Sequence, residues 1–193
     1  MEEGFRAPDW HAPLDLQARL EQLPEGLVVK GMFLQGFVDE AHQRSGRRPG
    51  RGAYTTFRDY PLREMLELMA ETVELAYPHV PPREGLRRLG HIAYPTFSQS
   101  TVGRVVMSMV GDDPKAALHH APKSYRLIGN AGTANVIDVA AKCCILELRD
   151  VWGWPDAYNV GVHEGAIKEW GLEGDVRVRV HSMCDVDLRI EWW

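Results

Sequence analysis

The sequence has few of the features that would identify a secreted protein or a membrane protein. It contains three cysteines, two of them adjacent, so no disulfide framework is expected and a reducing compartment is indicated. No apolar run approaches the ~20 residues that a membrane helix needs. The acidic start MEEGFRAPDW lacks the apolar core of a signal peptide. We therefore expect a cytoplasmic protein that is not inserted in a membrane.

Motifs that would identify an enzyme or a nucleotide-binding protein are also missing. The chain contains no GxSxG, HExxH, GxGxxG or GK[ST] sequence, and no cysteine lies in a recognisable nucleophile context. The net charge of −5 argues against general affinity for nucleic acid. We predict no catalytic residues and no nucleic-acid partner, and an enzyme is the less favoured interpretation.

What the sequence does contain is a change of hydrophobic period near Tyr125. Before it, PLREMLELMAETVELAYP carries apolar residues at i, i+3, i+4 and i+7, which predicts a helix. Further helices are expected over about 32–44, over about 82–93 before Pro95, and from Pro114 to near Pro122. After it, YRLIGNAG and AKCCILELRD are predicted strands, followed by a helix over about 155–170.

The last twenty residues, GDVRVRVHSMCDVDLRIEWW, alternate apolar and charged residues on both sides of a short polar break. This pattern predicts a hairpin with one apolar and one charged face. The predicted fold is α+β: a helical N-terminal half packed on an antiparallel sheet of about four strands, with the order strand, strand, helix, strand, strand. We expect an N-terminal arm over 1–24 and a single ligand-binding-like domain over 25–193.

The polar break HSMCD raises the question of a metal site. His181, Cys184 and Asp185 are all metal ligands in other proteins, and a closed zinc site would need two further ligands. No paired CxxC signature supplies them. We therefore favour a hairpin turn with a reduced cysteine, predict no metal, and assign no cofactor.

Arginines gather in RSGRRPGRG, where Gly and Pro predict a flexible loop. Arg47, Arg48 and Arg51 are candidates for binding an anion or an acidic partner, because guanidinium groups match phosphate and carboxylate oxygens in pairs. The alternative is a solvated loop without a ligand.

Aromatic side chains occur in both halves of the chain, and they form either a filled core or the wall of an apolar pocket. Tyr94, Tyr158 or His163 would supply polar selectivity in such a wall. The candidate ligand-binding residues are Phe33, Phe37, Tyr94, Phe97, Trp152 and Tyr158.

Four segments in order, LPEGLVVKGMFLQGFVDEA, FRDYPLREMLELMAETVELAYP, EGLRRLGHIAYPTFSQSTVGRVV and PKSYRL, resemble a myxobacterial paralogous family of uncharacterised proteins about 200 residues long. The order of elements also resembles vinyl-reductase-like domains, transport-protein-particle subunits and haem-nitric-oxide-binding domains. That likeness implies a dimer and an apolar pocket for a small hydrophobic molecule.

The metal and haem signatures of these relatives are altered in this chain. Their zinc-bearing members use an acidic residue and two cysteines near the last hairpin, whereas here His181 and Cys184 are followed by no further cysteine. Their haem branch uses Tyr-x-Ser-x-Arg, whereas KSYRLI places Ser124, Tyr125 and Arg126 in another order.

The leading functional hypothesis is a non-enzymatic sensory or ligand-binding module. It would hold a small apolar molecule between helices and sheet and signal through a homodimer or a protein partner. The alternative is a protein-interaction scaffold with a filled core and no ligand.

Overall fold

The computed structural model describes residues 3–111 and 113–193. No helix in these ranges is long and apolar enough to cross a membrane. The helices are α1 (Leu16–Gln22), α2 (Gly31–Ser45), α3 (Leu62–Ala76), α4 (Pro82–Gln99), α5 (Thr101–Val110), α6 (Pro114–Ile128) and α7 (Tyr158–Glu169), and the strands are β1 (Val28–Lys30), β2 (Asp59–Pro61), β3 (Thr133–Ala140), β4 (Cys143–Arg149), β5 (Gly174–Val180) and β6 (Val186–Trp192).

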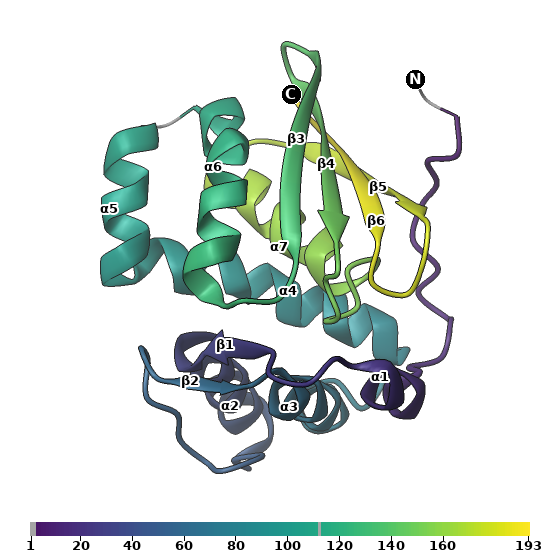
Figure 1. Cartoon of the computed structure of the whole chain (residues 1–193), viewed down its shortest axis with the longest axis vertical. Helices are drawn as coiled ribbons and strands as arrows, with labels where there is room; N and C mark the ends of the chain where they lie inside the picture. The colour runs from purple at the N-terminus through teal and green to yellow at the C-terminus, as the bar shows by residue number, and fades with distance from the viewer. Residues whose placement is uncertain (1–2, 112) are drawn as a thin grey trace.

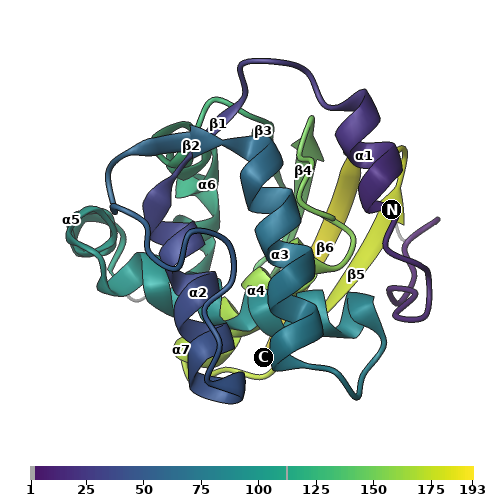
Figure 2. The same cartoon turned by 90° about the horizontal axis from the view of Figure 1, so that it is seen from below.

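The elements form a helical layer and a layer built around a sheet. In Figure 1, α1, α2 and α3 lie below the sheet with the short β1–β2 ribbon, and α4 runs between the two layers. Figure 2 shows α2 and α3 side by side in the lower layer. Helices α6 and α7 pack against the sheet, and α5 contacts α4 and α6 at the outer side. This arrangement confirms the predicted α+β class.

The sheet is antiparallel and has the strand order β3-β4-β6-β5. In the last hairpin Val178 pairs with Leu188 and Arg179 pairs with Asp187. Val176, Val178, Leu188 and Ile190 are each at most 2% exposed, so the alternation in the sequence separates a buried face from a charged one. The predicted antiparallel sheet of about four strands and the pairing of its last hairpin are therefore confirmed.

Two helices continue through prolines that were expected to end them. Helix α4 passes Pro95 and ends at Gln99, and α6 passes Pro122 and ends at Ile128. The prediction of a strand over YRLIGNAG was wrong, because this stretch belongs to α6 and its end, and β3 begins only at Thr133. A proline removes one hydrogen bond of the helix. Here the turn that follows each proline places an aromatic side chain, Phe97 in α4 and Tyr125 in α6, in the interior.

Glycines allow α4 and α7 to cross closely. A Cβ atom on Gly161 would overlap the carbonyl of Arg87, and one on Gly165 would lie 2.7 Å from the carbonyl oxygen of His91. On α4, Gly90 lies against the backbone of Tyr158 and Gly161 in the same way. Because this crossing leaves no room for side chains, it fixes the position of α7 relative to α4.

The N-terminal segment lies along the sheet and then joins the helical layer. Arg6 exchanges two backbone hydrogen bonds with Val178 on β5, of 3.0 and 2.9 Å. Within α1, Arg19 is 1% exposed and its side chain contacts residues far along the chain. The division into an arm over 1–24 and a domain over 25–193 stays a prediction.

Candidate functional site

A cavity of about 190 Å³ lies between the helical layer and the sheet layer. Its wall is mostly aliphatic and aromatic, with a few polar side chains. The lining residues are Val28, Val29, Phe33, Leu62, Met65, Ala93, Tyr94, Phe97, Val106, Met107, Ala117, Leu118, Ala121, Ser124, Tyr125, Ile128, Gly129, Ala131, Val151, Trp152, Gly153, Tyr158, Asn159, Val162, His163, Ala166 and Trp170.

Segments distant in the sequence build this wall. Helix α7 contributes a stripe at helical spacing that includes Tyr158, Val162 and Ala166. The last turns of α4 and α6, which follow their internal prolines, contribute Phe97 and Tyr125. The lining therefore depends on both helices continuing past a proline.

The β1–β2 ribbon is attached to the end of α6 beside the cavity. The Oδ1 atom of Asn130 accepts a hydrogen bond from the backbone N–H of Val28 at 2.7 Å, and its Nδ2 atom donates to the carbonyl oxygen of Gly26 at 3.0 Å. A Cβ atom on Gly129 would overlap the carbonyl of Val28, so glycine permits this approach. These contacts position Val28 and Val29 in the cavity wall.

Five of the six aromatic residues predicted to line a pocket do lie together in this wall: Phe33, Tyr94, Phe97, Trp152 and Tyr158. Phe37 does not line the cavity. It is 2% exposed and packs edge-on against Tyr158, with ring centroids 5.9 Å apart. Phe37 thus supports the wall from behind, and the ligand-binding role of all six stays a prediction.

The sequence reasoning missed several polar lining residues. Among these, Asn159 donates from Nδ2 to the hydroxyl of Tyr125 at 2.5 Å. Tyr94, which was predicted, donates to the sulfur of Met107 at 3.5 Å. Tyr125 was missed because it was assigned to a strand. Asn159 had a usable signal, because it lies four residues before His163 on the same face of α7.

Ionisable groups in the wall are held in their neutral forms. Burial lowers the pKa of His163 to about 4 and raises the pKa of Tyr94 to about 12. Burial also raises the pKa values of Tyr125 and Tyr158. No Asp, Glu, Lys or Arg is found among the described residues of the lining. The cavity is therefore uncharged at neutral pH.

Three lining side chains keep a buried nitrogen that has no hydrogen-bond partner among the described residues. These are the Nε1 atoms of Trp152 and Trp170 and the Nε2 atom of His163. Trp152 and His163 are each 8% exposed. Most buried polar atoms in proteins are paired, so unpaired ones need an explanation.

Arg19 fixes Trp152 in the wall through the backbone. Its Nη1 donates to the carbonyl of Trp152 at 3.1 Å and to that of Met183 at 2.6 Å. Its Nε and the indole of Trp154 both donate to Asp15, at 2.9 and 3.0 Å. The loop after β4 is thereby held between α1 and the last hairpin.

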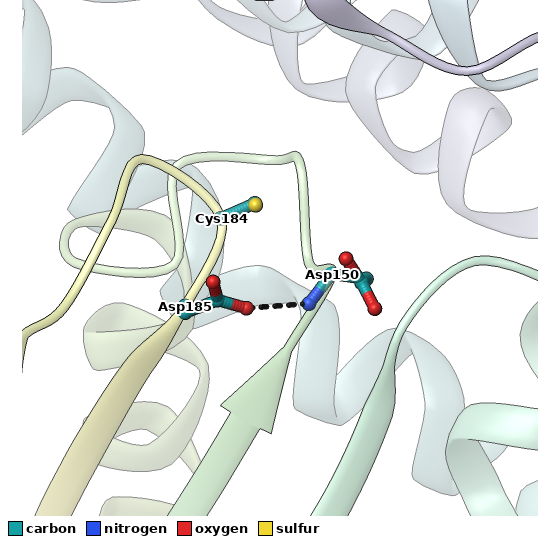
Figure 3. A group of neighbouring side chains, drawn as sticks. All are labelled: Asp150, Cys184 and Asp185. Atoms are coloured by element: carbon teal, nitrogen blue, oxygen red, sulfur yellow. Dashed lines mark hydrogen bonds between the residues drawn. The ribbon is translucent and has the colours of Figure 1, made fainter.

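The last hairpin places Cys184 and Asp185 beside Asp150, close enough for one metal ion (Figure 3). The carboxylate of Asp185 is already engaged, because it accepts the backbone N–H of Asp150 at 2.9 Å and the hydroxyl of Ser182 at 2.7 Å. The bond from Ser182 closes the hairpin turn, and the bond from Asp150 joins the turn to the segment after β4. Both explain Asp185 without a metal. The prediction of no metal has not been tested.

His181 belongs to a different cluster from Cys184. The side chain of Asp187 is 2% exposed and contacts Arg149 and Arg179 at 2.8 and 2.7 Å and His181 at 2.8 Å. Although burial alone would raise the pKa of Asp187, the hydrogen bonds from His181, Arg179 and Arg149 lower it. His181 therefore belongs to the cluster around Asp187 on the charged face of the sheet.

The arginine loop is only partly free to bind an anion. Arg51 forms a paired contact with Glu64, at 2.5 and 2.7 Å, and lies over the ring of Tyr60. Arg47 and Arg48 are exposed. The anion-binding prediction therefore depends on Arg47 and Arg48.

H-NOX proteins are among the solved structures that match this fold. An H-NOX protein from Shewanella oneidensis in the Fe(II)NO ligation state matches with a TM-score of 0.66 and 12% identity, covering 85% of this chain and 99% of that one. The Fe(II) unliganded H-NOX protein from K. algicida matches with a TM-score of 0.60 and 14% identity, covering 85% and 96%. At such identities the likeness shows the fold alone.

A third match concerns haem distortion in the H-NOX family, with a TM-score of 0.53 and 19% identity, covering 84% of this chain and 94% of that one. A haem does not fit the cavity described above. The volume of about 190 Å³ is below the roughly 300–1,000 Å³ of pockets for drug-sized ligands. The described lining also offers no Arg or Lys to neutralise the propionates.

A comparison with curated proteins found no match. A family model described as "Protein of unknown function (DUF2378)" matches residues 18–193. This range includes every segment that lines the cavity, from Val28 to Trp170. The chain therefore belongs to the DUF2378 family.

Proposed function

We propose that this chain is a non-enzymatic sensory module that holds a small apolar molecule in the cavity between its two layers. The observation that carries the proposal is an uncharged cavity of about 190 Å³ with an aliphatic and aromatic wall. A protein cavity of about 150 Å³ with a similar wall binds benzene. The H-NOX-like fold supports a sensory role.

The ligand would be sensed because it contacts both layers. Phe33 belongs to the helical layer, whereas Tyr158 belongs to α7 on the sheet. A molecule bound between them favours the arrangement in which both walls contact it. We propose that this change passes to a second copy of the chain or to another protein, with Arg47 and Arg48 as a contact for acidic groups.

We also propose that the chain is related to a myxobacterial paralogous family, that it is cytoplasmic and that it forms a homodimer. Size-exclusion chromatography with light scattering measures the dimer, for which we expect twice the 21.8 kDa of one chain. A mass of one chain at all concentrations would contradict the dimer and leave the cavity proposal standing.

Toluene is a suitable first probe of the cavity. At about ten times its dissociation constant, it should stabilise the protein by about 1.4 kcal/mol. For a chain of this size the melting temperature should rise by roughly 3 to 6 °C. Differential scanning calorimetry measures the shift.

A matched pair of variants locates the binding. Phe97→Trp enlarges a lining side chain and should remove the toluene shift. Phe57→Trp makes the same change at a side chain that is 61% exposed and should keep the shift. No shift in the unchanged protein would favour a filled core and the scaffold alternative.

A further inference from the structure

We propose that the ligand of this cavity is a small alcohol or phenol whose single hydroxyl group bonds to the hydroxyl of Tyr158. Tyr158 is the first residue of α7, and Phe37 packs against its ring. This inference rests on the proposed function and names the chemical class of its ligand and the side chain that binds the ligand's polar end.

The hydroxyl of Tyr158 is a polar group of the wall that a ligand can reach. It makes no hydrogen bond with any described residue. The unpaired nitrogens of Trp152 and His163 are closed off by their neighbours, but the oxygen of Tyr158 is not among the closed-off unpaired atoms of the described residues. The residue itself is partly exposed. Its oxygen therefore keeps a surface to which another molecule can bond.

The exposed surface of Tyr158 belongs to the cavity and not to the outside of the protein. Tyr158 lines the cavity at the place where α7 crosses Gly90 of α4. Neighbouring atoms surround its side chain so closely that burial raises its pKa. A residue that lies deep in the protein and is still partly exposed has its free surface on an internal space.

The other hydrogen-bonding groups of the wall are less suitable for this role. Asn159 and Tyr94 already donate, to Tyr125 and to a methionine sulfur. Ser124 lines the cavity and bonds to none of the described residues, but α6 has one buried side chain among those described. A hydroxyl on such a helix can bond to water instead. Tyr158 is therefore the deeper of the two unpaired hydroxyls.

A neutral hydroxyl group complements this wall. A phenolic hydroxyl both donates and accepts hydrogen bonds, and the described residues use neither function of Tyr158. A ligand hydroxyl can likewise do both. An ionised ligand would lose its hydration without gaining a counter-charge, because the described lining has no ionisable side chains other than neutral His163 and the tyrosines.

The volume permits a ring with two small substituents. About 190 Å³ is somewhat more than a cavity of about 150 Å³ that accepts benzene. 4-Methylphenol is therefore a suitable probe, and it is neutral at pH 7, as the side chain of tyrosine is. para-Xylene is its matched control, because a methyl group replaces the hydroxyl.

Isothermal titration calorimetry of the full chain and of Tyr158→Phe with both probes tests the inference. The substitution removes one oxygen atom and keeps the ring. We expect it to weaken binding of 4-methylphenol by about threefold to tenfold, because the hydroxyl of the ligand would be left unpaired. The affinity for para-xylene should stay within about twofold, since this probe makes no hydrogen bond.

Ser124→Ala is the matched control variant, because it removes the other unpaired hydroxyl of the lining. It should change the affinity for neither probe. Loss of 4-methylphenol binding in Ser124→Ala and not in Tyr158→Phe would overturn the assignment to Tyr158. Circular dichroism checks that each variant is folded. An equal loss for both probes in Tyr158→Phe would indicate damage to the cavity and would count against a hydrogen bond.

The outcomes separate this inference from the proposed function. Binding of both probes with the same affinities in the unchanged protein and in Tyr158→Phe would overturn the inference and leave an apolar ligand-binding cavity. 4-Methylbenzoate should bind at least tenfold more weakly than 4-methylphenol, and equally tight binding would overturn the neutral class. Binding of neither 4-methylphenol nor para-xylene would overturn the proposed function together with the inference.

Discussion

At the scale of the residue, the cavity wall combines an apolar surface with single polar atoms whose environment is unusual. His163 lies on α7 among apolar neighbours, with Val162 and Ala166 beside it in the lining. Burial there disfavours the imidazolium form. Protonation of His163 would therefore change both the charge of the cavity and the stability of the fold.

The stability of the protein should fall in acid because of His163. Its pKa is about 6.5 when unfolded and about 4 when folded, so between these values the unfolded chain binds more protons. The contribution of His163 to the free energy of unfolding is therefore complete above pH 6.5. It decreases by roughly 3 kcal/mol as the pH falls toward 4.

Urea denaturation at several pH values measures this effect. His163→Leu should remain folded and should lose this part of the acid dependence. The same slope in both proteins would show that His163 is accessible to protons in the folded state.

At the scale of the element, the close crossing of α4 and α7 positions both the cavity and the sheet layer. In Gly161→Ala the added methyl group would lie 1.9 Å from the carbonyl oxygen of Arg87. This oxygen belongs to the backbone of α4, so it cannot move away without moving the helix. We expect a loss of about 3 kcal/mol or more in the free energy of unfolding. Chemical denaturation measures it.

Gly36→Ala on α2 is the matched control for that substitution. A Cβ atom there would lie 3.6 Å from Thr96, which is ordinary contact. Since alanine favours helix over glycine, this variant should be neutral or more stable by up to about 1 kcal/mol. Equal effects of the two substitutions would mean that α4 and α7 are not in close contact.

At the scale of the whole molecule, Arg19 joins three regions that are far apart in the sequence. It bonds to the carbonyls of Trp152 and Met183 and to Asp15, and its guanidinium lies 5.1 Å from the ring centroid of Trp154. Removing a buried charge from such a network leaves its partners unpaired.

Arg19→Met should destabilise the protein by about 3 kcal/mol and weaken binding of apolar probes, because Trp152 loses its support. Arg47→Met changes an exposed arginine in the same way and should alter stability by less than about 0.5 kcal/mol. Thermal denaturation with and without toluene measures both effects. A stable Arg19→Met variant with unchanged binding would show that the N-terminal helix does not support the cavity.

Hydrophobic period predicted most of the fold. The last hairpin was predicted with its buried face, because Val178 and Leu188 alternate with charged neighbours over two whole strands. The extent of α4 and α6 was not predicted, because a proline usually ends a helix and the sequence does not show what the following turn packs against.

The candidate site was predicted less completely than the fold. The aromatic residue types predicted much of the cavity wall, since five of the six predicted residues lie in it. Phe37 has the same character but lies behind Tyr158. About one turn of α2 separates Phe33 in the lining from Phe37 behind it, and hydrophobic character alone cannot resolve that difference.

The sequence by itself determined the class of the fold, the last hairpin with its buried face and the lack of recognisable catalytic motifs, because these follow from local period and residue type. Only the tertiary structure decided that the core contains a cavity and that Trp152 and His163 keep unpaired nitrogens. The reason is physical: a cavity and an unpaired atom depend on how distant segments meet, and close packing is a property of the assembled layers.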